Sequence, residues 1–476
     1  GSPGVINITA PTLLIDGKGA PDTFTGIAGD VLTGLGAGAE VSVNANRLSI
    51  VNGASVSSAT YTGSNAGSVR INADVLIVDG GDRSHATGIS ADSGGAGNAG
   101  SVLIKAREMT LSNEALVSTS TLDTGQGGAI SIDAGSLTVD SAAGIVSVTA
   151  GPGAAGNIDL RVVNALVLRQ GGALSANTGG EGAAGRISVS AGSFLATGSD
   201  AASGFKTQVI SRARQGSGGQ PGSITLNVRD TFELLDGAAL SIANDAQVAN
   251  PGAIATPTLR VQANRIVLNA GDITAAASVN ANAGQIVLTS AGGIQLKGSS
   301  VRTSALDGDG GPITLTAGGL VLLKDSRITS SVDGLSNGNG GDITITSPAL
   351  VLASGFVQAN TTAPLARGGQ VQINAGLLLP DGNNVFVGGS RIETFRSGVP
   401  GYNVIQAAAP DGVSGQLSVT LPQLDLSAGL VSLSTRRLDL GVVARDVCEV
   451  GPDSRLSIQG RGALREPASA PLRLQP

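Results

Sequence analysis

A short motif, in which glycine is followed by alternating aliphatic and polar residues, recurs along nearly the whole chain. It reads Gly-x-Φ-x-Φ-x-small, where Φ is aliphatic, and it appears fourteen times if three weaker copies at Ala39, Pro257 and Gly415 are included. The stronger copies begin at Gly4, Gly67, Gly100, Gly128, Gly156, Gly185, Gly222, Gly284, Gly311, Gly341 and Gly369. Most neighbouring copies lie 27 to 37 residues apart, which indicates a repeat protein with insertions of different length.

Each repeat contains three short apolar runs. Alternation with a period of two, bounded by Gly, Asn, Asp and Ser, predicts β-strands, and no helical spacing is sustained. A strand this short is stable only when it pairs with its counterparts in the turns above and below. We therefore expect an all-β, right-handed parallel β-helix (β-solenoid) over residues 1–420, with about 13–14 turns of roughly 28 residues and three short strands per turn. The variable stretches before each glycine should form loops along one edge.

Alternation also predicts which side chains form the core. In two consecutive repeats, six side chains should all face the same interior: Ile130, Ile132, Leu137, Val139, Ile158 and Leu160. In the repeat that starts at Gly311, the expected core residues are Ile313, Leu315, Leu320, Leu322 and Ile328. The glycine itself should supply either a positive φ or a close backbone approach at the corner.

Composition and charge narrow the class of partner. Charged residues make up 13% of the chain, about half the usual share, and the net charge is −6 without a basic stripe. Nucleic acid is therefore not an expected partner. The only cysteine is Cys448, so no internal disulfide can form. The sequence shows no apolar run of 18 residues, so no membrane-spanning segment is expected. It also shows no signal peptide at its start.

After residue 420 the repeat ends and the composition changes. Arginine and proline become frequent, and Cys448 is followed by "SRLSIQGRGAL" from Ser454 to Leu464 and then by "REPASAPL". Because a solenoid leaves open strand edges at its ends, residues 421–476 are expected to form a C-terminal cap or tail.

Together, the glycine-rich repeats and this tail resemble the C-terminal portion of two-partner secretion exoproteins of the filamentous haemagglutinin class. The resemblance implies export across the outer membrane of a Gram-negative bacterium through an outer-membrane β-barrel transporter. It also implies an extracellular or cell-surface adhesin or fibre, with a host, surface or polysaccharide ligand as a further partner. A third alternative is a protein that assembles end to end into filaments without a ligand, because an uncapped first turn at "GVINITA" would offer a strand edge to another copy. The family's N-terminal secretion domain has no counterpart in the sequence, so the resemblance implies the distal part of a longer precursor.

Few residues are candidates for chemistry. The single histidine, His85, is expected to be a solvated loop residue, because neighbouring Asp and Ser are common in polar loops. Parallel β-helices also host polysaccharide lyases and hydrolases, for which Asp307, Asp309 and Asp333 are the candidate acids. An isolated Asp-Gly-Asp is more often a turn than a calcium loop. We therefore expect no catalytic, cofactor or metal site, and keep a polysaccharide-active enzyme as the alternative function.

Two features of the tail stay open at this point. Cys448 is either a small buried hydrophobe or the partner in an intermolecular disulfide. The Gly460 to Gly462 segment is either a recognition element for export or a structural clamp.

Overall fold

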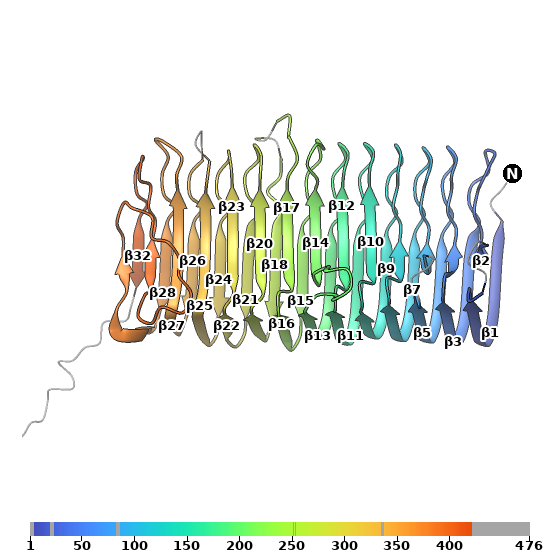
Figure 1. Ribbon diagram of the computed structural model, residues 1–476, viewed down its shortest axis with the longest axis horizontal. Helices are drawn as coiled ribbons and strands as arrows, with labels where there is room; N and C mark the ends of the chain where they lie inside the picture. Colours follow the sequence, from blue (N-terminus) through green and yellow to red (C-terminus); the bar gives the residue numbers. More distant parts are fainter. Residues whose placement is uncertain are drawn as a thin grey trace, which may run out of the picture. The chain divides into compact units, whose positions relative to one another are not determined.

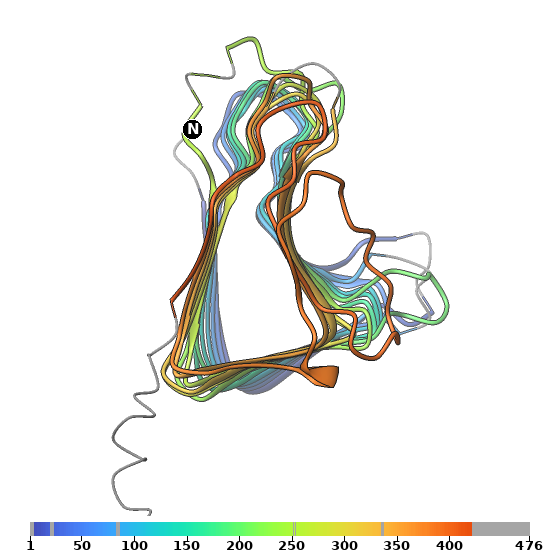
Figure 2. The same ribbon diagram turned by 90° about the vertical axis from the view of Figure 1, so that its left-hand side faces the viewer.

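The computed structural model describes residues 4–420, except 20–22, 82–85, 251, 253 and 335–337. The chain divides into two units, Gly1–Pro422 and Gln423–Pro476, and the described residues all belong to the first. This unit is an all-β parallel solenoid of about 12 turns with roughly 29 residues per turn. Figure 1 shows the turns stacked side by side, and Figure 2 shows a roughly triangular cross-section drawn out at one corner.

Each turn has three sides, numbered here in chain order. The fourteen predicted motif copies all lie in one column of parallel strands, which forms the first side. In the first seven turns a single bent strand forms both the first and the second side. These strands are β1 (Val5–Asp16), β3 (Glu40–Val51), β5 (Val69–Asp79), β7 (Val102–Ser112), β9 (Ile130–Val139), β11 (Ile158–Arg169) and β13 (Ile187–Thr197).

In the next three turns the two sides are separate strands. They are β15 (Ile224–Val228) with β16 (Thr231–Leu235), β18 (Thr258–Ala263) with β19 (Arg265–Asn269), and β21 (Gln285–Ser290) with β22 (Ile294–Lys297). The third side consists of β2 (Thr25–Ala28), β4 (Ala54–Ser57), β6 (Gly88–Ser90), β8 (Leu116–Ser118), β10 (Gly144–Thr149), β12 (Ala173–Thr178), β14 (Gln208–Ala213), β17 (Ala239–Asn244), β20 (Asp272–Ala277) and β23 (Ser300–Ala305).

Towards the C-terminal end the turns change shape. β24 (Ile313–Ala317) and β26 (Ile343–Ser347) form the first side, and β25 (Leu320–Val332) and β27 (Ala349–Thr361) each run through the second and third sides. A longer turn follows, with β28 (Val371–Ala375), β29 (Leu378–Pro380), the 3-10 turn η2 (Asp381–Asn383), β30 (Phe386–Val387) and β31 (Val404–Gln406). β32 (Leu417–Thr420) then pairs with β28. The count of fourteen motif copies thus exceeds the 12 regular turns, because the last two copies belong to this expanded turn and to one further strand.

The predicted core is confirmed in the middle of the rod. All six predicted core residues of the two consecutive repeats are at most 3% exposed: Ile130, Ile132, Leu137, Val139, Ile158 and Leu160. Ile158 and Leu160 stack on Ile130 and Ile132 of the preceding turn. They belong to one continuous hydrophobic cluster, which contains residues from Ile15 to Ala407. Phe194 and Phe232, from adjacent turns, stack inside it with ring centroids 5.0 Å apart. Thin aliphatic layers therefore continue from turn to turn as one core.

The prediction for the second run of the Gly311 repeat was wrong by one residue. Ile313, Leu315 and Ile328 are fully buried as expected, but Leu320 is 38% exposed and Leu322 is only partly buried. Val321 and Leu323 face the core instead. The buried positions of the preceding strand, Ile313, Leu315 and Ala317, keep the same parity through the corner at Gly318 and Gly319, so Val321 and Leu323 are the next to face the core.

The repeated glycines are required by a close backbone approach and not by a positive φ. A Cβ on Gly100, Gly128 or Gly156 would lie under 3.0 Å from the carbonyl oxygen of the equivalent glycine one turn earlier, and none of these glycines has a positive φ. Buried hydroxyls of the third side hold the same backbone: Thr119 donates to the Gly128 carbonyl oxygen, and Gly156 N donates to Ser147 Oγ at 2.9 Å. Of the two reasons offered by the sequence, the structure selects the close approach.

Loops that precede the motif form one row along the top of Figure 1, as expected from the sequence. The expanded turn adds a second kind of loop. It reaches back along the third side, where Gly398 N donates to Asp325 Oδ1 at 2.7 Å and the Phe395 ring lies 5.1 Å from that of Phe356. Its path outside the triangular section is visible in Figure 2. No helix among the described residues is long and apolar enough to cross a membrane.

Candidate functional site

The acids named from the sequence do not converge on a site. Asp307, Asp309 and Asp333 are all exposed at the loop edge. Asp309 belongs to a ladder between turns, in which its Oδ1 accepts from Asn339 N at 2.8 Å and its own N donates to Asn282 Oδ1 at 2.9 Å. This geometry is that of a structural cap on loop backbone.

The other residues singled out cannot be placed. His85, Cys448 and the Gly460 to Gly462 segment lie outside the described residues, as does the predicted cap at 421–476. Within the described part of the chain, no group of three His, Cys, Asp or Glu side chains could hold a metal ion.

A different place, on the third side of the first four turns, brings polar and aromatic groups together around a hollow of about 270 Å³. Its floor comes from β4, β6 and β8, and it is lined by serine hydroxyls, two carboxyl groups and the rings of Phe24 and Tyr61. This hollow was not found from the sequence.

The two carboxyl groups occupy equivalent positions two turns apart. Val31, Thr60 and Ser93 are bridged in register, so the residues before them, Asp30, Ala59 and Asp92, stack in one column. The short side chain of Ala59 leaves a gap between the two acids. The hollow is therefore a consequence of one small residue between two larger polar ones.

Each acid is oriented by the next turn in the same way. Asp30 accepts from Ala59 N at 2.7 Å and from Ser57 Oγ at 3.0 Å. Asp92 accepts from Ser120 N and from Ser118 Oγ, both at 2.6 Å and both at Oδ1. The Oδ2 atom of Asp92 has no hydrogen-bond partner among the described residues.

The electrostatics of the hollow follow from this placement. Burial raises the pKa of the Asp92 carboxyl above its usual range, against the lowering effect of the hydrogen bonds from Ser118 and Ser120; the charge of Asp30 raises it further. Partial burial, together with the charges of Asp30 and Asp92, also raises the pKa of the Tyr61 phenol. Both groups are thus more readily protonated than exposed counterparts, and the Asp92 carboxyl is a hydrogen-bond donor when it is protonated.

Two exposed aromatic rings form the rim. Phe24 is 60% exposed and lies beside Gly26, and Tyr61 is 59% exposed and lies beside Gly94. A Cβ on either glycine would come within 3.0 Å of the neighbouring ring, so both glycines make room for the rings. In a chain with only 2% aromatic residues, two exposed rings beside one hollow are a concentrated feature.

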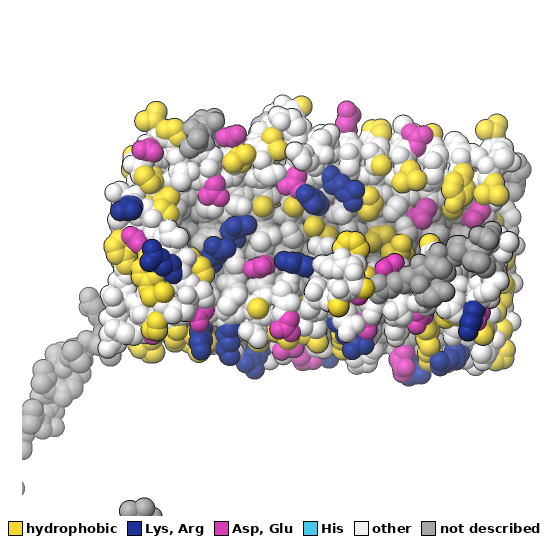
Figure 3. Space-filling model, viewed as in Figure 1, with side chains coloured by type: hydrophobic (Ala, Val, Ile, Leu, Met, Phe, Trp, Pro, Cys, Tyr) yellow, Lys and Arg dark blue, Asp and Glu magenta, His cyan; other side chains and the backbone are white. Residues whose placement is uncertain are grey.

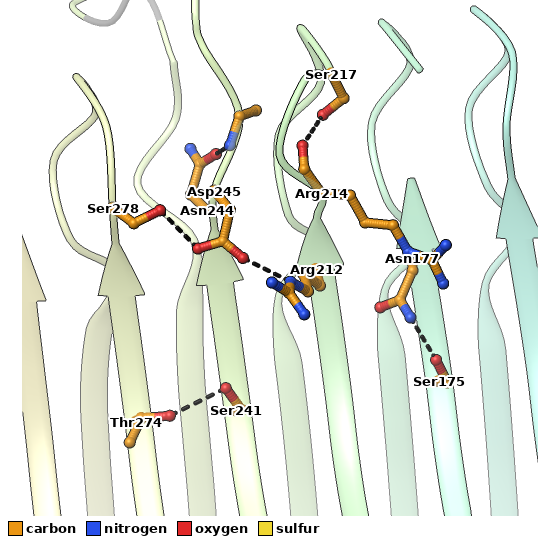
Figure 4. A network of polar contacts seen from close by, with 11 residues as sticks. Ser175, Asn177, Arg212, Arg214, Ser217, Ser241, Asn244, Asp245, Thr274 and Ser278 are labelled. Carbon is orange, nitrogen blue, oxygen red and sulfur yellow. Dashed lines mark hydrogen bonds and ion pairs between the residues drawn. The ribbon is translucent and has the colours of Figure 1, made fainter. Parts of the chain in front are cut away.

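Elsewhere on the same side, the polar groups bind one another. In Figure 4, Asp245 accepts from Arg212 Nε at 2.5 Å through one oxygen and from Ser278 Oγ at 2.7 Å through the other, and Thr274 bonds Ser241 at 3.0 Å. Both carboxylate oxygens of Asp245 are therefore occupied. Figure 3 shows that charges of both signs are interspersed over this face, without a large region of one sign.

The loop of the expanded turn makes a second self-contained cluster. Arg327 lies over the Phe395 ring, 5.5 Å from its centroid, and Tyr402 donates to Glu393 at 2.5 Å. Burial and the neighbouring Arg302 lower the pKa of Arg327. These contacts attach the loop to the rod and leave the hollow near the N-terminal end as the candidate site.

Comparison with known proteins gives no further assignment. No protein-family model, no curated protein and no solved structure matches this chain. The function is therefore argued from the geometry.

Proposed function

We propose that the protein is a non-enzymatic adhesive β-solenoid of a Gram-negative bacterial surface, of the filamentous haemagglutinin class. It would be secreted through an outer-membrane β-barrel transporter and would contact a surface or polysaccharide ligand. The observation that carries this proposal is the hollow of the first four turns, a site with exposed aromatic rings on a rigid repeat scaffold. The repeats supply reach, and the tail motif supplies the resemblance to exported proteins.

Two measurements test the proposal. Beads coated with the purified chain should be retained under flow on cell surfaces or polysaccharide films, compared with beads that carry an unrelated protein of similar net charge. In cells that make the full precursor, protease added outside should digest the repeats, and removal of the transporter should protect them. Equal retention of both kinds of bead, or protection in cells with an intact transporter, would contradict the proposal.

The second candidate function is a polysaccharide-active enzyme, and one observation favours it. Acids from nearby turns line a hollow with an aromatic platform, and one of them, Asp92, has a raised pKa, as a general acid requires. Against this, both carboxyl groups accept hydrogen bonds from backbone of the next turn, which gives each a structural role. New reducing ends or unsaturated sugars after incubation with polysaccharides, lost in Asp92→Asn, would establish the enzyme.

A further inference from the structure

The lining of the hollow combines hydroxyl-bearing and apolar surfaces in a way that limits what it can bind. Ser55 and Ser90 line it, and their hydroxyls have no hydrogen-bond partner among the described residues. With Asp92 Oδ2, they provide donors and acceptors on the floor, while the rings of Phe24 and Tyr61 form the rim. A sugar ring has the complementary arrangement, with hydroxyls at its edge and an apolar C–H face that lies against aromatic rings.

The charge of the hollow decides between classes of sugar. Two carboxyl groups line it, and the lining residues that the structure describes include no lysine or arginine. A uronate, sulfate or phosphate group would meet like charge from these two carboxyl groups. Anionic glycans are therefore disfavoured.

The surface beside the hollow extends along the rod axis. Leu32, Tyr61 and Leu122 occupy equivalent positions in the first, second and fourth turns and are 69%, 59% and 71% exposed, with Gly94 in the third. The hollow itself, at about 270 Å³, is slightly below the roughly 300–1,000 Å³ of small-molecule pockets. It thus holds a small part of a ligand whose remainder lies along this exposed row.

We infer that the hollow is a binding subsite for an uncharged hexose unit of a polysaccharide that runs along the rod axis. The inference rests on the proposed adhesive function and assigns its ligand class. Tyr61 and Phe24 stack on the sugar face, Asp92 Oδ2 accepts from a sugar hydroxyl, and Ser55 and Ser90 bind others.

The chain offers a local probe for the test. It has no tryptophan and only two tyrosines, Tyr61 and Tyr402. In Tyr402→Phe, tyrosine emission therefore reports on Tyr61 alone. The whole chain with this substitution would be titrated with mannan, dextran, galactomannan and cellohexaose, and with polygalacturonate and heparin as anionic probes. We expect a saturable change in emission with at least one neutral glycan and none with the anionic ones.

Calorimetry on variants then locates the site. Tyr61→Ala should weaken binding of the neutral glycan roughly two- to tenfold through loss of the ring contact. Asp92→Asn should also weaken it, since its Oδ1 keeps the bonds to Ser118 and Ser120 while the free acceptor is replaced by an amide N–H₂. Asp309→Asn, in the distant structural ladder, is the matched control and should bind unchanged. Thermal unfolding of each variant checks that the rod is intact.

The outcomes separate this inference from the proposed function. Absence of any emission change with the four neutral glycans, tighter binding of an anionic probe, or unchanged affinity in Tyr61→Ala would overturn the inference. The adhesive function would still stand in each case if coated beads are retained under flow. If the beads are not retained while the neutral glycan binds at Tyr61, the subsite is correct and the adhesive role is wrong.

Discussion

Replacement of one repeated glycine tests the account of the solenoid most directly. In Gly128→Ala the new Cβ would lie under 3.0 Å from the carbonyl group of Gly100, and the backbone cannot retreat because Gly156 packs against Gly128 from the other side in the same way. The corner must open. Two buried hydrogen bonds are then lost: Gly128 N to the Thr119 carbonyl, at 3.1 Å, and Thr119 Oγ1 to the Gly128 carbonyl.

The size of the effect follows from those two bonds. Leaving a buried donor or acceptor unpaired costs about 1–3 kcal/mol, so the variant should lose about 2–6 kcal/mol of unfolding free energy. Gly63→Ala is the matched control, because Gly63 is exposed, its φ is not positive and a Cβ there meets nothing within 4 Å. This control should stay within about 0.5 kcal/mol of the wild type.

Urea unfolding followed by circular dichroism measures the difference. Because solenoid stability is nearly a sum over turns and their interfaces, hydrogen exchange should also show which turns open first. Faster exchange is expected around Gly128 and in the turns on either side. A loss in Gly128→Ala no larger than in Gly63→Ala would refute the close-approach explanation of the motif.

Three further predictions concern the register, the buried acid and the tail. Leu323→Asp should destabilise the rod by several kcal/mol, whereas Leu322→Asp should change it by about 0.5 kcal/mol or less, since only the former buries an unpaired carboxylate; equal losses on urea unfolding would contradict the corrected register. Because burial raises the pKa of Asp92 in the folded protein above its ordinary value, its contribution to stability is fully present below the ordinary pKa and is lost as pH rises through the folded pKa. Asp92→Asn should therefore raise the melting temperature relative to wild type at pH 7 and lose that advantage near pH 3, and an advantage independent of pH would contradict this. Deletion of Val447–Pro476, which lies outside the described residues, should lower the melting temperature and increase light scattering through exposed strand edges; no change in either would show that the segment is not a cap.

The sequence was sufficient to predict the fold because the same physical requirement recurs in every turn. A strand with one buried face alternates in polarity, and a tight corner between stacked turns excludes a Cβ, so both appear as a periodic pattern. Where a run is aliphatic at every position, as in "LVLL" from Leu320 to Leu323, parity cannot be read from the letters. The buried positions there follow the parity of the preceding strand, in which Ile313 and Leu315 face the core.

The candidate site was missed for a related reason. Asp30 and Asp92 are 62 residues apart in sequence and each lies in an ordinary polar stretch. Their relation is visible only when the third runs of successive turns are aligned, which places Asp30, Ala59, Asp92 and Ser120 in one column. Single-chain alternation does not give that alignment, because the number of residues between the runs varies from turn to turn. Searching aligned columns for a small residue between two acids is a signal that would have found it.

The direction of the hydrogen bonds has a mechanical consequence. Strands lie across the rod and their backbone bonds point along its axis, so tension applied to the two ends loads these bonds one row at a time. Each turn that peels away shortens the folded rod by only about 4.8 Å but frees roughly 29 residues, about 100 Å of extended chain. Under load the solenoid would therefore yield in small repeated steps with a large gain in length, as a tether that dissipates force before its far end detaches.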